Sequence, residues 1–199
     1  MALCFSAHAR GFYGIAGGGI AEHPMSGGRG HWQQAPEYST DIDTRSPTFT
    51  LGVGYQVKPW LAFEADYRDL GSLSGHIQFT TDEAYSAGEP GPLYTAYINS
   101  QSRGIGLSAL LSTGNKSTPL ARIGIFYHDS TFAPILVNGT TLTTFHDDGN
   151  PLDDKDIGWM FGVGWKYNNV RVEYTYFPNV AAQNTPYWDV QTVTVSVTF

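Results

Sequence analysis

Apolar and polar residues alternate with a period of two through most of this chain, which is the spacing of β-strands with one apolar and one polar face. The last segment is the clearest example. Its apolar positions are Val193, Val195, Val197 and Phe199, and a Thr or Ser lies between each pair. An apolar strand at the edge of a soluble sheet invites aggregation. The pattern therefore favours a strand whose apolar face meets lipid.

Seven further segments show the same alternation, which predicts eight strands in all. They span residues 11–20, 48–57, 60–70, 101–113, 119–130, 157–167, 170–177 and 190–199. Most are about ten residues long, the length that a tilted membrane-spanning strand requires. Helices are disfavoured because apolar residues recur at i and i+2 rather than at i, i+3 and i+4.

The connections between these segments are alternately short and long. The short links are Lys58-Pro59, Gly114-Asn115-Lys116 and Asn168-Asn169, and the long ones span residues 21–47, 71–100, 131–156 and 178–189. Asn and Gly accept the positive φ that tight hairpins need. Outer-membrane barrels have short periplasmic turns and long external loops in this way. We predict an all-β fold, an eight-stranded antiparallel up-and-down transmembrane barrel over residues 10–199, in which the last strand pairs with the first.

Composition narrows the class of protein further. Charged residues make up 15% of the chain, compared with about 25% in ordinary soluble domains. The net charge is −7 and no Lys/Arg cluster occurs, which argues against a nucleic-acid partner. No apolar run approaches the roughly 20 residues of a membrane-spanning helix. The single cysteine, Cys4, has no partner for a disulfide or a cysteine metal site, and we expect no cofactor.

Residues 1–9 form a short apolar stub that ends in Ala7-His8-Ala9. This ending has the small-x-small form of a secretory cleavage site, although the stub is short and lacks a charged beginning. We interpret residues 1–9 as a truncated export signal, with a disordered tail as the alternative.

Aromatic residues fall into two groups when the chain ends are placed at the periplasmic side. The periplasmic group is Tyr55, Trp165, Tyr167 and Phe199, and the outer group is Phe49, Tyr67, Tyr127, Trp159 and Tyr176. Aromatic rings prefer the headgroup level of a bilayer, so a lipid-facing barrel carries a girdle at each interface.

The segment from Leu51 to Gly71, LGVGYQVKPWLAFEADYRDLG, resembles the second hairpin of OmpA-like eight-stranded outer-membrane barrels. The opening Gly11-Phe12-Tyr13-Gly14 and the closing Phe199 match that group as well. The resemblance implies a multi-pass protein of the bacterial outer membrane, without a peptidoglycan-binding domain. It also implies that the barrel-assembly machinery reads the last strand during biogenesis. That role falls on Val193, Val195, Val197 and Phe199.

Several charged residues fall on the inward face of the predicted strands. They are Glu64, Asp66, Arg68, Arg122, Lys166, Arg171 and Glu173. An eight-stranded barrel is just wide enough for side chains to fill it, and unpaired charges there are costly. We expect a lumenal ion-pair network. The alternatives are a gate across a narrow pore and acid–base catalysis by Glu64 and Asp66.

His128-Asp129-Ser130 is the one arrangement that suggests hydrolysis, because lipid A deacylases of the outer membrane use a His-x-Ser pair. Tyr127 and Ile125 are expected to face lipid, so His128 and Ser130 face the interior, away from acyl chains. We therefore predict no enzymatic activity and keep a lipid A-modifying hydrolase as a remote alternative.

Acidic residues gather in the third long link at Asp147, Asp148, Asp153, Asp154 and Asp156. Their spacing does not match an EF-hand loop, and we interpret them as a solvated acidic loop rather than a Ca²⁺ site. The pairs Gly52/Gly54, Gly104/Gly106 and Gly162/Gly164 lie within strands. They place small residues on the crowded inner face rather than forming nucleotide-binding loops.

These observations predict a monomeric, integral outer-membrane barrel in contact with outer-membrane lipid and lipopolysaccharide. We expect a structural or surface-interaction role, in envelope integrity or adhesion, with any surface ligand bound by the long external loops. The Gly-lined inner face motivates an alternative, a small passive channel for ions or small hydrophobic solutes.

Overall fold

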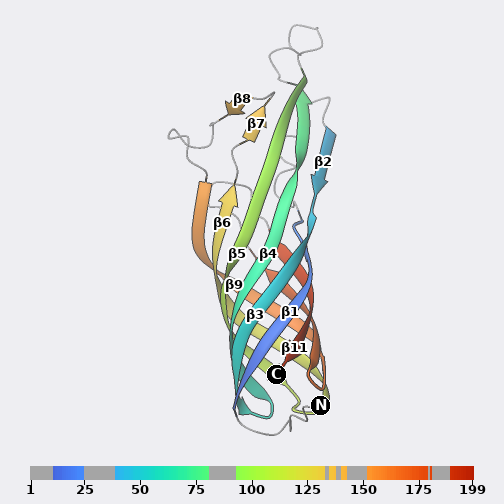
Figure 1. Ribbon diagram of the computed structural model, residues 1–199, viewed down its shortest axis with the longest axis vertical. Helices are drawn as coiled ribbons and strands as arrows, with labels where there is room; N and C mark the ends of the chain where they lie inside the picture. Colours follow the sequence, from blue (N-terminus) through green and yellow to red (C-terminus); the bar gives the residue numbers. More distant parts are fainter. Residues whose placement is uncertain are drawn as a thin grey trace.

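Eight long antiparallel strands form a closed barrel in the computed structural model (Figure 1). The described residues are 11–24, 39–80, 93–132, 135–137, 140–142, 152–178, 180 and 189–199. The barrel strands are β1 (Phe12–Glu22), β3 (Arg45–Lys58), β4 (Leu61–Thr80), β5 (Leu93–Ser112), β6 (Ser117–Phe132), β9 (Leu152–Tyr167), β10 (Val170–Phe177) and β11 (Val190–Thr198). No helix among the described residues is long and apolar enough to cross a membrane.

Pairing of the last strand with the first closes the barrel, as predicted. β1 and β11 are antiparallel from Ile15↔Thr198 to Glu22↔Gln191. Two further main-chain hydrogen bonds extend the ladder, from Gly14 N to Phe199 O (2.7 Å) and from Phe199 N to Gly14 O (3.1 Å). The last strand therefore has neighbours on both sides and no free edge.

The alternation of apolar and polar residues decides which side chains face outward. In β3, Phe49, Leu51 and Val53 are exposed on the outer surface, whereas Thr48 and Thr50 are buried inside. β10 and β11 repeat this pattern of exposed and buried positions. The apolar side of each strand thus covers the outside of the barrel, as expected for a surface that meets lipid.

Three tight turns lie at one end of the barrel, where β1 begins and β11 ends (Figure 1). Asn168 adopts φ 53° and Gly114 adopts φ 80°, in the region that Asn and Gly tolerate best. The predicted links at 114–116 and 168–169 are confirmed, and the first turn is at Pro59-Trp60. We call this end the turn end and the opposite end the loop end.

Several strands are longer at the loop end than the sequence predicted. β4 continues to Thr80 and β5 begins at Leu93, whereas the predicted strands spanned 60–70 and 101–113. The register shifts between Asp69 and Ser72, where Gly71 has φ 78°. This bulge explains why the sequence pattern did not predict the longer β4, because its extra residue reverses the phase of the alternation. Beyond it Leu73 is fully buried.

The long links also contain three short strands, although they were predicted as polar connections. β2 (Ser39–Asp43) pairs with β4, β7 (Ile135–Val137) pairs with β5, and β8 (Thr140–Leu142) pairs with β7. Together with the extensions of β4 and β5 they form a five-stranded sheet in the order β2-β4-β5-β7-β8, which projects from the loop end (Figure 1). We call it the loop-end sheet.

Gly14 gives a test of barrel closure. A Cβ atom at Gly14 would lie 2.5 Å from Cε2 of Phe199, whereas one at Gly18, also on β1, would have Thr48 O at 3.5 Å as its nearest neighbour. We expect Gly14→Ala to displace the Phe199 ring and destabilise the barrel by about 1–3 kcal/mol, the usual cost of overpacking. Gly18→Ala should be near neutral.

The measurement is urea unfolding in lipid vesicles, with gel migration before and after boiling as the assay of the folded fraction. Equal stability of the two variants would show that the contact between Gly14 and Phe199 does not constrain closure.

Candidate functional site

The barrel interior holds six buried charged side chains. They are Glu64, Asp66 and Arg68 of β4, Arg122 of β6, and Arg171 and Glu173 of β10. Inward positions of three strands bring them together, because residues i and i+2 of a strand share a face. Three carboxylates meet three guanidinium groups, so the cluster is neutral overall. We call it the ion-pair layer.

Arg122 lies at the centre of the ion-pair layer and contacts all three carboxylates. Its Nη2 lies 2.6 Å from Oε2 of Glu64 and its Nε 2.5 Å from Oε1 of Glu173. Its Nη1 lies 3.4 Å from Oδ2 of Asp66 and donates to Ser108 Oγ at 2.5 Å. One fully buried guanidinium therefore links β4, β5, β6 and β10 across the lumen.

The other two arginines flank this centre. Arg171 Nη1 donates to Oε1 of Glu64 at 2.8 Å, and Arg68 binds both oxygens of Asp66 at 2.8 and 3.0 Å. The hydroxyl of Tyr13 donates to Oε1 of Glu64 at 2.6 Å. Both carboxylates proposed as acid–base candidates are thus bound by arginines. Tyr13 was not predicted, because the Gly17-Gly18-Gly19 run blurs the alternation of the first strand.

The burial of the ion-pair layer makes it sensitive to the loss of a single member. Buried ions lose their hydration, and they are tolerated only where opposite charges and hydrogen bonds replace it. Here Arg122 and Glu64 are each at most 3% exposed. Removing one arginine would leave carboxylates without compensation in the lumen.

An apolar cluster closes the lumen next to the ion-pair layer, toward the loop end. It comprises Ala21, Leu70, Phe126, Met160, Phe177, Val180 and Val190. The rings of Phe126 and Phe177 lie 5.0 Å apart, and the Arg68 guanidinium lies 5.6 Å from the Phe177 ring centroid. We call this cluster the apolar layer. Strand parity places Phe126 and Phe177 inward, so the sequence held the signal for them.

The inner glycines make room for these two layers, as predicted. A Cβ at Gly106 would lie 2.7 Å from Cε of Met160 and 2.8 Å from Oδ1 of Asp66. A Cβ at Gly162 would lie 3.1 Å from both Arg122 Cβ and Glu173 Oε1. The glycines therefore line a filled interior rather than an open pore.

His128 and Ser130 point into the barrel beyond the apolar layer. Both are fully buried, and His128 Nδ1 lies 3.3 Å from Oγ of Ser130. That hydroxyl also donates to the carbonyl of Val180 at 2.9 Å and lies 2.9 Å from Oγ of Ser102. The pair is therefore placed away from the lipid-facing surface that an acyl chain would contact.

A comparison with known protein families shows which family this chain belongs to. A family model, the OmpA-like transmembrane domain, matches residues 12–199. The chain belongs to this family. It is an integral barrel of the bacterial outer membrane, and the turn end and loop end are the periplasmic and external ends of such barrels.

Among solved structures, Neisserial surface protein A shares 17% identity, with 94% of this chain and 95% of that chain covered and a TM-score of 0.49. OprG from Pseudomonas aeruginosa shares 11% identity, with 96% and 97% covered and a TM-score of 0.48. Ail of Yersinia pestis, solved with the heparin analogue sucrose octasulfate, shares 10% identity, with 96% and 100% covered and a TM-score of 0.44. No curated protein matches significantly.

The aromatic residues assigned to two girdles of this OmpA-like barrel all lie in its strands or at their ends. All except Tyr176 are exposed on the outer surface, from 37% for Tyr67 to 64% for Phe199. Trp165 Nε1 donates to Ser117 Oγ at 3.0 Å near the periplasmic turns, and the Tyr176 hydroxyl donates to Asp189 Oδ2 at 2.6 Å at the external end. These rings have an apolar body and a hydrogen-bonded tip, which suits a membrane interface.

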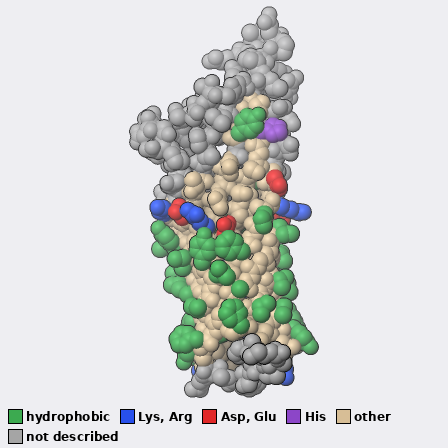
Figure 2. Space-filling model, in the orientation of Figure 1, with side chains coloured by type: hydrophobic (Ala, Val, Ile, Leu, Met, Phe, Trp, Pro, Cys, Tyr) green, Lys and Arg blue, Asp and Glu red, His purple; other side chains and the backbone are tan. Residues whose placement is uncertain are grey.

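A belt of charged side chains lies above the apolar surface (Figure 2). Asp69, Arg103, Asp129 and Lys155 face one another in register across β4, β5, β6 and β9, so the sign alternates from strand to strand. Arg45 and Glu22 pair at 3.4 Å on the neighbouring strands. We call these six residues the outer charged belt.

His23 follows the outer charged belt and lies inside the barrel. Its Nε2 lies 3.1 Å from the carbonyl oxygen of Leu70. Burial lowers the pKa of His23 from its ordinary value, because a charged imidazolium there would lose its hydration. The ring is therefore neutral at neutral pH and packs as part of the external half of the core.

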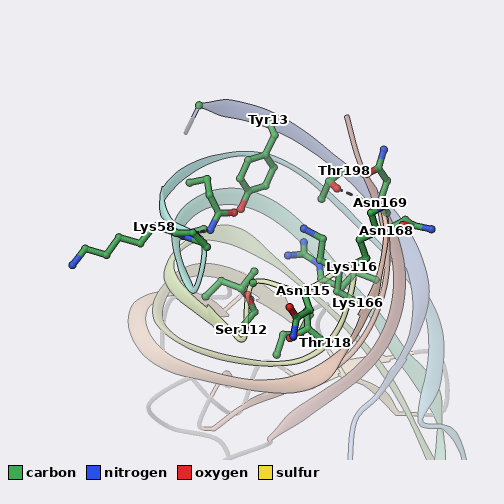
Figure 3. Close-up of a pocket in the computed structure, with 18 of the residues that line it drawn as sticks. Tyr13, Lys58, Ser112, Asn115, Lys116, Thr118, Lys166, Asn168, Asn169 and Thr198 are labelled. Atoms are coloured by element: carbon green, nitrogen blue, oxygen red, sulfur yellow. Dashed lines mark hydrogen bonds between the residues drawn. The ribbon is translucent and has the colours of Figure 1, made fainter. Parts of the chain in front are cut away.

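Lys166 lies outside the ion-pair layer, contrary to the prediction. It forms no ion pair within 4.0 Å in the described part of the chain. It lines a pocket of about 400 Å³ in the lumen at the periplasmic end (Figure 3). The strand alternation predicted that Lys166 faces inward, but it gave no information on where Lys166 lies along the barrel axis. Lys166 lies closer to the periplasmic end than the carboxylates of the ion-pair layer.

The acidic residues of the third external loop do not form a metal cluster among the described residues. Asp153, Asp154 and Asp156 belong to β9, opposite Thr131, Ser130 and His128 of β6. Asp147 and Asp148 lie outside the described residues, as do residues 1–9 and Cys4.

Arg122 tests the ion-pair layer of the OmpA-like barrel directly. We expect Arg122→Met to reduce the free energy of unfolding by about 3–5 kcal/mol, because Glu64 and Glu173 lose their central counter-ion. The matched control is Arg45→Met, which breaks the exposed pair with Glu22 and should cost at most about 1 kcal/mol. Unfolding by urea in lipid vesicles measures both. Equal losses would contradict a dominant role for the buried pairs.

Proposed function

We propose that this protein is a non-conducting outer-membrane barrel with a structural and surface-interaction role. The observation that carries the proposal is the filled lumen, which the ion-pair layer and the apolar layer occupy at two successive levels. A passive channel would need both layers to open. Opening would separate Arg122 from three carboxylates and expose the packed rings of Phe126 and Phe177 to water, and both changes are costly.

The loop-end sheet supports an interaction at the cell surface. In the described part of the chain, β2 pairs with β4 alone and β8 with β7 alone. Each therefore has one edge whose main-chain groups are not paired with another strand. Such edges are sites for strand addition by a partner. We propose that partners bind the external face of the barrel through this sheet and its links.

Charge favours a particular class of partner for this face. The external segments 23–44, 70–102, 131–154 and 178–189 contain eleven acidic residues and one basic residue, Arg29. A surface of one sign attracts and orients ligands of the opposite sign. The external face thus suits cationic protein surfaces and divalent cations better than polyanions.

The outer charged belt supports an anchoring contact with lipopolysaccharide. Arg45, Arg103 and Lys155 are exposed, and they belong to the belt that borders the apolar surface. Guanidinium and ammonium groups at that level are placed to bind the phosphates of the outer leaflet. The intervening carboxylates of Asp69, Asp129 and Glu22 keep the belt neutral and suit divalent cations that bridge to the same phosphates.

The proposal includes no enzymatic step and no cofactor. Glu64 and Asp66 are bound by arginines, and His128 and Ser130 are buried away from lipid. We propose that the barrel is monomeric, and that the assembly machinery reads Val193, Val195, Val197 and Phe199. The exposure of these four side chains on the outer surface supports such a signal.

Single-channel recording separates this proposal from the channel alternative. We expect no reproducible conductance steps from the folded protein in planar bilayers, because the two layers block the lumen. The contradicting result is regular steps from the wild type that disappear in Gly162→Leu. A larger residue at Gly162 narrows the lumen beside Arg122, so loss of the steps would locate the current inside the barrel.

Surface binding tests the external face. A variant in which a tight turn replaces residues 73–99 removes the projecting hairpin and keeps the barrel. We expect the intact protein in vesicles to bind polylysine in a salt-sensitive way and to bind heparin at least tenfold more weakly, because charge steers association. The shortened variant should lose part of the polylysine binding, because residues 73–99 hold three of the eleven acidic residues. Equal binding of heparin and polylysine would contradict the charge argument.

A further inference from the structure

We propose that the lumenal pocket at the periplasmic end binds a small phosphate-bearing anion. The pocket, about 400 Å³ in volume, is lined by residues of the tight turns and of the adjoining strand ends (Figure 3). This volume lies in the range of small-molecule sites, about 300–1,000 Å³. We call it the periplasmic pocket. The inference is independent of the role proposed for the external face.

The lining of the periplasmic pocket is basic in a protein that is acidic overall. Lys58, Lys116, Lys166 and Arg171 line it, and no Asp or Glu does, although the chain has a net charge of −7. Lys58 runs outward, away from the pocket (Figure 3), and its Nζ lies 5.3 Å from the Trp60 ring centroid. Arg171 already pairs with Glu64 at 2.8 Å, so Lys116 and Lys166 remain to act on an anion inside the pocket.

Two of the basic residues that line the pocket are direct cross-strand neighbours. Lys166 of β9 lies opposite Arg171 of β10, and Thr118 of β6 flanks it on the other side. Like charges in this arrangement destabilise a sheet. Lys166 is partly buried and forms no ion pair within 4.0 Å with any described residue, and the whole lining is described. A bound anion would offset this unfavourable pairing.

Glu64, the nearest side-chain carboxylate, already accepts hydrogen bonds from three other side chains. Glu64 accepts from Arg122 at 2.6 Å, from Arg171 at 2.8 Å and from the Tyr13 hydroxyl at 2.6 Å. It is 3% exposed and lies deeper in the lumen than the pocket. No side-chain carboxylate of the pocket lining is therefore available to neutralise Lys116 and Lys166.

The donors of the periplasmic pocket suit phosphate. Two ammonium groups and a guanidinium are accompanied by the side-chain amides of Asn115, Asn168 and Asn169. A phosphate monoester carries about −1.5 to −2 charge at pH 7 and three acceptor oxygens, which match several convergent donors. The phosphodiester headgroup of an inner-leaflet phospholipid carries a charge of about −1, and it shares with the soluble monoester the anionic phosphate oxygens that these donors would bind. The experiment distinguishes the two sources.

The test is amide NMR of the full chain, with glycerol 3-phosphate titrated into the protein in zwitterionic micelles. We expect shifts at Lys116, Lys166 and Asn168, and a roughly tenfold weaker half-saturation in Lys166→Gln, the effect of losing one charge-assisted hydrogen bond. Lys58→Gln is the matched control, because the Lys58 side chain runs outward from the pocket, and it should leave the half-saturation nearly unchanged. Gel migration before and after boiling confirms that both variants fold.

A second arm identifies the source of the phosphate. The same amides are compared in phosphatidylcholine nanodiscs with and without phosphatidylglycerol. Shifts with glycerol 3-phosphate assign a soluble ester, and shifts with phosphatidylglycerol alone assign a lipid headgroup. Each supports the anion site if Lys166→Gln weakens it. The proposal is overturned if neither probe shifts these amides, if sodium chloride at equal ionic strength shifts them equally, or if Lys166→Gln has no effect.

Discussion

The structure depends on neutralising charge inside a closed barrel whose interior is packed with side chains at the level of the ion-pair layer. Eight strands enclose an interior that side chains fill, so any ion placed there must find its counter-ion among its neighbours. Arg122 meets this requirement for three carboxylates at once. Its contacts connect strands that are distant in the sequence, and the inner glycines leave the space that it needs. Fold and occlusion of the lumen thus have the same physical cause.

The charge of the side chains changes along the axis of this barrel, from the external end to the periplasmic end. The external segments are strongly acidic, the ion-pair layer is neutral, and the periplasmic turns carry Lys58 and Lys116 without a carboxylate. The outer charged belt alternates in sign at the boundary of the apolar surface. This distribution separates two environments for ligands. The proposed ligands follow this division, cations at the external face and anions at the periplasmic pocket.

The sequence predicted the barrel well because membrane strands follow one strict rule, apolar side outward. This rule yielded the eight strands, the closing pair and the inward positions of Glu64, Arg122 and Glu173. It failed at the loop end, where Gly71 reverses the phase of β4 and the apolar side turns inward. The rule also could not show where along the barrel axis an inward side chain lies. Lys166 and Arg171 both face inward, yet of these two only Arg171 forms an ion pair with Glu64. The positions of two side chains relative to each other along the axis depend on the stagger between their strands, and the sequence of a single strand does not show that stagger.

Arg122 and its carboxylates form one coupled network across the lumen. A double-mutant cycle of Arg122→Met and Glu173→Gln, measured by urea unfolding in lipid vesicles, tests this coupling. We expect a coupling energy above about 1 kcal/mol, within the range found for residues that share a buried network. A coupling energy near zero would contradict it, because the two side chains would then contribute to stability independently.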